Sequence, residues 1–98
     1  MLHILNKSPL QTNTLDTVLR LAPAGALLLI EDAVYAATRG TVAEPKLRQA
    51  MDRMKVYALA PDLAARGMAD RLIDGVATVD YDGFVELVVE HPNSQSWL

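Results

Sequence analysis

The 98-residue sequence contains no cysteine. This absence excludes disulfides, thiolate metal sites and every reaction that needs a sulfur nucleophile within this chain. A chain without disulfides is also typical of the reducing cytoplasm, which is the location that we expect for it.

Long apolar runs and clusters of basic residues are missing as well. The longest apolar stretch, Ala22 to Ile30, is far shorter than the roughly 20 residues of a transmembrane helix, so we expect no membrane association. The beginning of the chain, MLHILNKSP, lacks a basic segment and a cleavage signal, so it is predicted to be a strand and not a targeting peptide. Nine Lys and Arg residues are scattered along a chain of net charge −3. This pattern argues against direct binding of nucleic acid, and the moderately basic run from Lys46 to Lys55 is interpreted as a solvated helix face.

The composition indicates a single domain that spans residues 1–98 and retains some apolar surface. Hydrophobic residues make up 51% of the chain. A domain of this size leaves a large fraction of its surface exposed, so part of this apolar content is available for subunit contacts. We therefore expect an oligomer; for the isolated chain, a homo-oligomer and a monomer both stay open.

Short apolar runs separated by helical patterns predict an α/β fold. The run Ala26–Ile30 is apolar without alternation, which is typical of a parallel strand that is covered on both faces. Strands are predicted at Leu2–Leu5, Ala26–Ile30, Lys55–Leu59, Val76–Val79 and Ser96–Leu98. The resulting architecture has three layers, with a mostly parallel five-stranded sheet between helices.

The helices are predicted from capping residues and apolar stripes. Asn13 is a candidate N-cap with Asp16 at the third helical position, and the helix ends at Pro23-Ala24-Gly25. Asp32 is expected to cap a short helix over Ala33–Thr38. The remaining predicted helices start near Pro45 with the stripe Leu47, Ala50, Met51 and Met54, cover Asp62–Arg66, and run from the cap Asp80 to His91.

Three polar groups are predicted at the carboxyl ends of strands, where α/β proteins usually place their function. They are Asn6-Lys7-Ser8, Glu31-Asp32 with Tyr35, and Asp80-Tyr81-Asp82. Ser8 lacks the glycines of a nucleophile elbow, so a turn is the favoured interpretation, and Lys7 is interpreted as solvated. Neighbouring carboxylates point in different directions, so Glu31 and Asp32 are poorly placed for acid–base catalysis; an interface or pocket role is retained for Glu31.

The last helix and the two histidines also have structural interpretations. Asp80 and Asp82 suit the positive end of a helix dipole, whereas Gly83 weakens the helix and suggests close approach of another backbone, such as that of a partner. His3 and His91 have no partner at metal-ligand spacing. We predict no catalytic residue, metal or cofactor, although a small enzyme that uses Ser8, Glu31 or Asp32 stays an alternative.

Four segments together resemble the TusB/DsrH family of sulfur-relay subunits. They are LHILNKSP, ALLLIEDAVYAA, KVYALAPDLAARG and VDYDGFVELVVEHPNSQSWL, so the resemblance covers essentially the whole chain, and TusB is the most similar branch. The resemblance implies a DsrE/F/H-like fold and a hetero-hexamer with homologous TusC-like and TusD-like subunits. In the Tus branch such a complex passes persulfide sulfur toward 2-thiouridine at the tRNA wobble position; in the Dsr branch it serves sulfur oxidation.

The resemblance also implies a division of labour between subunits. DsrH-type members carry a cysteine in the first helix, at the position of Val18 here, and the transferring cysteine of the Tus complex belongs to the TusD-like subunit. A non-catalytic structural role follows for this chain, and DsrH-like sulfur oxidation is the alternative. The terminal Trp97 is predicted to lie on a strand beside the first one, packed at a subunit contact or within the monomer. The candidate interface residues are Trp97, Leu98, Glu31, Tyr35 and Gly83.

Overall fold

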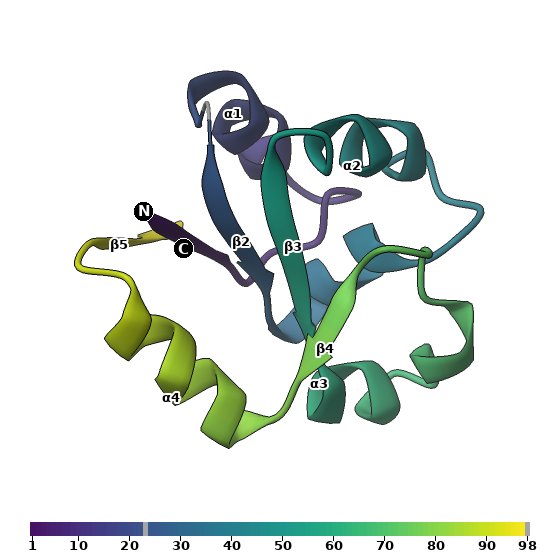
Figure 1. Cartoon of the computed structure of the whole chain (residues 1–98). Helices are drawn as coiled ribbons and strands as arrows, with labels where there is room; N and C mark the ends of the chain where they lie inside the picture. The colour runs from purple at the N-terminus through teal and green to yellow at the C-terminus, as the bar shows by residue number, and fades with distance from the viewer. Residues whose placement is uncertain (23, 98) are drawn as a thin grey trace.

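A five-stranded parallel sheet forms the centre of the protein (Figure 1). The computed structural model describes residues 1–22 and 24–97. The strand order is β4-β3-β2-β1-β5, and each neighbouring pair is parallel. The elements are β1 (Leu2–Leu5), α1 (Thr14–Leu21), β2 (Gly25–Leu29), η1 (Glu31–Ala37), α2 (Glu44–Ala50), β3 (Met54–Leu59), α3 (Ala60–Ala65), η2 (Ala69–Arg71), β4 (Ala77–Val79), α4 (Tyr81–Glu90) and β5 (Ser94–Trp97). The α/β prediction is confirmed, with a sheet that is wholly parallel among these strands.

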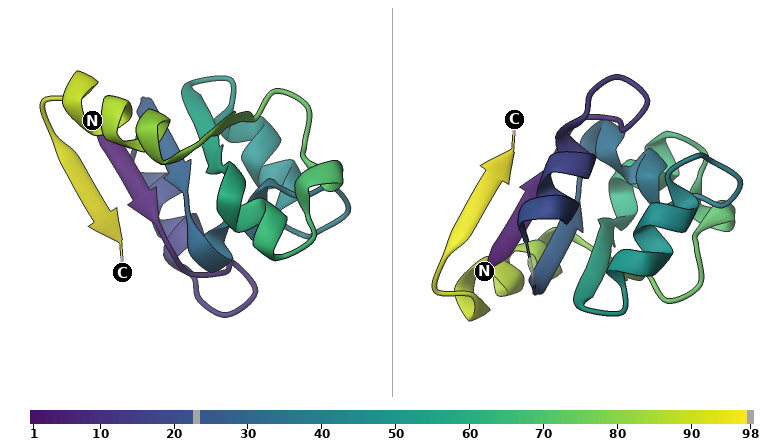
Figure 2. Two further views of the ribbon diagram at one scale, coloured as in Figure 1. Left: turned by 90° about the horizontal axis from the view of Figure 1, so that it is seen from below. Right: turned by 90° about the horizontal axis from the view of Figure 1, so that it is seen from above.

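Helices cover both faces of the sheet and create two hydrophobic clusters. Figure 2 shows α1 and α2 over one face and α4 over the other. The first and larger cluster contains Val18 of α1, Leu47 of α2 and Leu63 of α3. The second cluster places Leu87 of α4 against Leu2 and other strand residues. Because β1 and β2 lie under both layers, their side chains other than His3 are apolar on both faces, which explains the absence of alternation.

The C-terminal strand lies beside β1, as predicted. Leu5 is in register with Trp97, so residues from opposite ends of the sequence are neighbours in the sheet. The strand begins at Ser94, two residues earlier than predicted. Ser94, Gln95 and Ser96 are exposed on both sides of an edge strand, so no apolar pattern indicates their conformation. Leu98 and Pro23 lie outside the described residues.

Two predicted helix caps are wrong. Asn13 precedes α1 but makes no side-chain capping bond, and Asp16 pairs with Lys46 at 2.8 Å. Asp32 lies inside η1, a 3-10 helix, and pairs with Arg66 at 2.8 Å. In both cases a basic side chain from a distant part of the sequence binds the carboxylate.

The predicted helix from Pro45 is shorter than its apolar stripe suggested. The helix α2 ends at Ala50, and Met54 is the first residue of β3. Met54 is nevertheless buried in the same cluster as Leu47, so its apolar character reflects the sheet and not the helix. Within residues 1–22 and 24–97, no helix is long and apolar enough to cross a bilayer.

Candidate functional site

Members of two of the three predicted polar groups line one open cavity at the carboxyl ends of β1 and β2: Ser8 of the first group, and Asp32 and Tyr35 of the second. The cavity has a volume of about 360 Å³ and is lined by Ser8, Leu10, Gln11, Asp32 and Tyr35. The third group, Asp80-Tyr81-Asp82, follows β4 at the start of α4 and does not line it.

Ser8 has the structural role expected of a turn residue. Its side chain is buried, and its Oγ accepts a hydrogen bond from the Leu10 backbone N–H at 3.1 Å. The two histidines are engaged elsewhere: His3 with Trp97, and His91 with the carbonyl oxygen of Leu87. Ser8 therefore lacks the adjacent base that would activate a nucleophile.

Glu31 occupies an unusual backbone conformation at the end of β2. Its φ is 51°, in the left-handed region, and its backbone N–H donates to Asp62 Oδ2 at 2.6 Å. Its side chain is exposed. The next carboxylate, Asp32, is bound by Arg66, so the two acids differ in environment and do not converge on one point. This geometry supplies no acid–base pair, and the exposed Glu31 carboxylate is free for contacts outside the chain.

The same end of the sheet contains one buried polar atom without a partner. Asn6 follows β1 directly, and its Oδ1 accepts no hydrogen bond from any residue that the structure describes. Tyr35 is half-buried at the cavity wall, and its carbonyl oxygen accepts a hydrogen bond from Thr38 Oγ1 at 2.7 Å. Within the described residues no three His, Asp or Glu side chains are grouped to hold a metal ion.

Trp97 is joined to the first strand by its side chain as well as by its backbone. Its Nε1–H donates to His3 Nδ1 at 3.2 Å, and the indole packs partly buried against the first cluster. Burial, with a smaller contribution from the positive charge of the N-terminal amino group, lowers the pKa of His3. His3 is therefore the satisfied structural histidine that the sequence suggests, and Trp97 is half-buried within the monomer while part of its surface stays accessible.

Gly83 has an intramolecular explanation. A Cβ at this position would lie 2.9 Å from the Cβ of Val79 and 3.4 Å from Asp80 Oδ1. Asp80 is the N-cap of α4, as predicted, and accepts a hydrogen bond from the Gly83 N–H at 2.8 Å. The close neighbour is thus the preceding strand of the same chain, and a partner's backbone is not required.

A second cavity, of about 280 Å³, lies between α1 and α2. Its lining includes Arg20, Lys46 and Arg53 together with Asp16. The guanidinium of Arg53 donates to the carbonyl oxygens of Leu19 and Ala22, at the end of α1. The sequence gives no signal for this cavity, because it depends on how the two helices pack.

Comparisons with known proteins connect this fold to one family. A family model described as DsrH like protein matches residues 7–94. The chain belongs to the DsrH-like family. Proteins named TusB from Pectobacterium parmentieri and from Escherichia coli (strain K12 / DH10B) are 42% and 39% identical to it. Each alignment covers 99% of this chain and 100% of the relative, which confirms the resemblance inferred from the four segments.

Solved structures share the fold of this DsrH-like chain at lower sequence identity. The ychN protein of E. coli has a TM-score of 0.81 at 20% identity, over 98% of this chain and 97% of that one. A protein of unknown function from Methanobacterium thermoautotrophicum has a TM-score of 0.71 at 18% identity, over 98% and 96% of the two chains. These similarities support the DsrE/F/H-like architecture and carry no argument about activity.

Proposed function

We propose that the chain is a non-catalytic subunit of a TusB-like sulfur-relay complex, in which it joins homologous TusC-like and TusD-like subunits as a hetero-hexamer. The observation that carries this proposal is the full-length similarity to proteins named TusB. It is supported by a structure in which the predicted polar groups act as turns, caps and ion pairs and do not form a catalytic set.

The chemistry of sulfur transfer supports a structural role. A relay subunit that carries sulfur needs a thiolate, which attacks a persulfide and holds the outer sulfur as a new persulfide. This chain has no cysteine. The position that matches the cysteine of DsrH-type members is Val18, which is fully buried on the sheet side of α1. The sulfur-carrying cysteine is therefore assigned to the TusD-like partner, and this chain holds that partner in place.

We further propose that the complex acts in the cytoplasm and supplies sulfur for 2-thiouridine at the tRNA wobble position. The relatives named TusB favour this pathway over sulfur oxidation. Direct contact with tRNA is not part of the proposal, because a net charge of −3 disfavours binding to a polyanion.

Reconstitution of the complex tests this function. The TusC-like and TusD-like subunits from the same organism are mixed, with and without this chain, with a persulfide donor, the downstream tRNA-thiolating enzyme and substrate tRNA, and 2-thiouridine is measured by mass spectrometry of nucleosides. We expect thiolation only when this chain is present, with the persulfide on the partner's cysteine. Full thiolation without this chain, or a persulfide on the purified chain alone, would contradict the proposal.

The candidate interface residues Trp97, Leu98, Glu31 and Tyr35 are part of this proposal, whereas the close neighbour of Gly83 lies within the chain itself. Aromatic side chains that are partly buried in the monomer are frequent anchors of subunit contacts. Removal of Trp97 and Leu98 should weaken co-purification with the partners, and Trp97→Phe, which keeps the strand and loses the indole N–H, should weaken it less. Unchanged assembly and an unchanged melting temperature after the truncation would rule out the role of the C-terminus.

A further inference from the structure

The outward face of α4 carries an apolar row beside an acidic row. Tyr81, Val85 and Val89 are spaced by four residues, and their exposed fractions are 61%, 61% and 78%. The carboxylates Asp82, Glu86 and Glu90 follow one position later with the same spacing and are also exposed. Residues four apart lie on the same face of a helix, so the two rows run along α4 next to each other.

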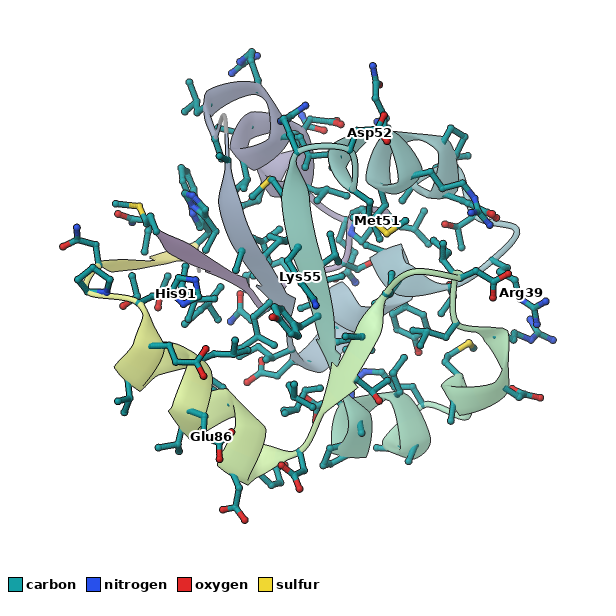
Figure 3. All side chains as sticks on the ribbon, viewed as in Figure 1. Arg39, Met51, Asp52, Lys55, Glu86 and His91 are labelled. Atoms are coloured by element: carbon teal, nitrogen blue, oxygen red, sulfur yellow. The ribbon has the colours of Figure 1, made fainter. Side chains whose placement is uncertain are left out.

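The fold does not use this apolar row. The opposite side of α4 already supplies Leu87, which is 5% exposed, and the half-buried Phe84 to the second hydrophobic cluster. Figure 3 shows Glu86, a member of the acidic row, on the side of α4 that points away from the sheet. Contiguous exposed apolar side chains that are not needed by the monomer indicate a surface for a partner.

The other large apolar side chains that are exposed among the described residues come from separate segments of the chain. They are Met1, Leu10, Leu21 and Val42. On α4, by contrast, Val88 is 40% exposed and adjoins Val85 at a spacing of three residues, which widens the apolar row into a patch. We call Tyr81, Val85, Val88 and Val89 the α4 patch.

The charged side chains of α4 and of the segment that leads into it have one sign. The sequence contains no Lys or Arg after Arg71, and five carboxylates follow that residue: Asp74, Asp80, Asp82, Glu86 and Glu90. The basic side chain on the sheet face that α4 covers is that of Lys55 in β3, which is in register with Ala26. Its ammonium nitrogen lies 5.8 Å from the centre of the Tyr57 ring. A second copy of this chain docked antiparallel through the same patch would bring acidic rows together, which disfavours this form of self-association.

We propose that the α4 patch docks one of the homologous relay subunits, through a surface that is apolar in its centre and flanked by Lys or Arg. This inference rests on the proposed function, because it assigns a surface to the assembly proposed above. The apolar row supplies the buried centre of the contact, and the acidic row selects the sign of the partner's charge and fixes its orientation.

Polar substitutions in the α4 patch test whether its apolar row forms the buried centre of the contact. The double variant Val85→Gln and Val89→Gln keeps helix propensity, because glutamine is at least as good a helix former as valine. The matched control is Val42→Gln, since Val42 is 73% exposed and lies outside α4. Dissociation constants are measured against the co-purified TusC-like and TusD-like subunits, with circular dichroism as the check of folding. We expect about tenfold weaker binding for the double variant and no change for the control.

Reversal of a charge on α4 tests whether the acidic row selects a partner with basic residues. Glu86→Lys and Asp52→Lys change the net charge of the chain by the same amount, but Asp52 is exposed in the turn between α2 and β3, away from α4 (Figure 3). Glu86→Lys should weaken binding more than Asp52→Lys does. The binding of the wild-type chain should also weaken as salt rises, because salt screens the exposed charge pairs.

The outcomes separate this inference from the proposed function. If the wild-type chain binds its homologous subunits and the α4 variants bind equally well, the docking surface is wrong and the relay function stands. If the wild-type chain does not bind them, both are wrong. If the isolated wild-type chain forms a dimer that Val85→Gln and Val89→Gln dissociate, the occupant is a second copy and the charge argument is overturned.

Discussion

Acidification is expected to release Trp97 from the first strand. The indole Nε1–H donates to His3 Nδ1 at 3.2 Å, which requires that this nitrogen carry no proton. Protonation of His3 turns Nδ1 into a donor and removes the bond. A neutral hydrogen bond of this kind contributes about 0.5–1.5 kcal/mol to the free energy of unfolding. For a domain of this size, about 1 kcal/mol corresponds to a change of roughly 4–8 °C in melting temperature.

The direction of the pH dependence follows from the lowered pKa of His3 in the folded protein. In the unfolded chain the imidazole titrates near its ordinary value of 6.5. Just below that pH the unfolded state binds more protons than the folded state, so the stability contributed by neutral His3 is complete above 6.5. It is lost as the pH falls from 6.5 through the lower pKa of the folded state.

The only tryptophan of the chain is the reporter for this test. Thermal unfolding is followed by tryptophan fluorescence and circular dichroism between about pH 7.5 and about pH 5 at constant salt, for the wild type and for His3→Gln. We expect the wild type to lose about 1 kcal/mol more than His3→Gln over this range, because glutamine does not titrate. The variant His91→Gln controls for the second histidine. Identical pH profiles for the wild type and His3→Gln would refute the reasoning.

Three further substitutions test other contacts. Asp80→Ala removes the acceptor for the Gly83 N–H and should cost about 1 kcal/mol of unfolding free energy, measured by urea denaturation; a change within error would contradict the capping role. Gly83→Ala places a Cβ 2.9 Å from that of Val79 and should destabilise by about 1–3 kcal/mol, and this loss should shrink in a Val79→Ala background. Val18→Cys introduces a single buried thiol that should react with a thiol reagent only after unfolding, so rapid modification of the native protein would show that the position is accessible.

The sequence predicts those elements whose residue pattern has a cause within the element itself. The strands β1 and β2 are buried on both faces; the uninterrupted apolar run of β2 indicates this directly, and that of β1 is broken only by His3. The cap of α4 is also predicted correctly, because Asp80 binds a backbone group only three residues away. In these cases the pattern and its cause lie within a few neighbouring residues.

The errors come from contacts that join distant parts of the chain. Asp16 is predicted to complete a capping box and Asp32 to cap a helix, but Lys46 and Arg66 bind them across the fold. Met54 extends a helical stripe in the sequence, yet the chain turns into β3 before it is reached. The cavity between α1 and α2 and the position of Gly83 against Val79 likewise depend on packing that local patterns do not contain.

The position of β1 between β2 and β5 has a consequence for biosynthesis. The strand comes from the first five residues, while β5 is supplied by residues 94–97. One edge of β1 therefore stays without its neighbour until residues 94–97 have been translated. Unpaired strand edges recruit other chains, so a nascent polypeptide that stops short of residue 94 is a target for aggregation and for chaperones at that edge. Residues 94–97 thus decide whether this edge of β1 is paired.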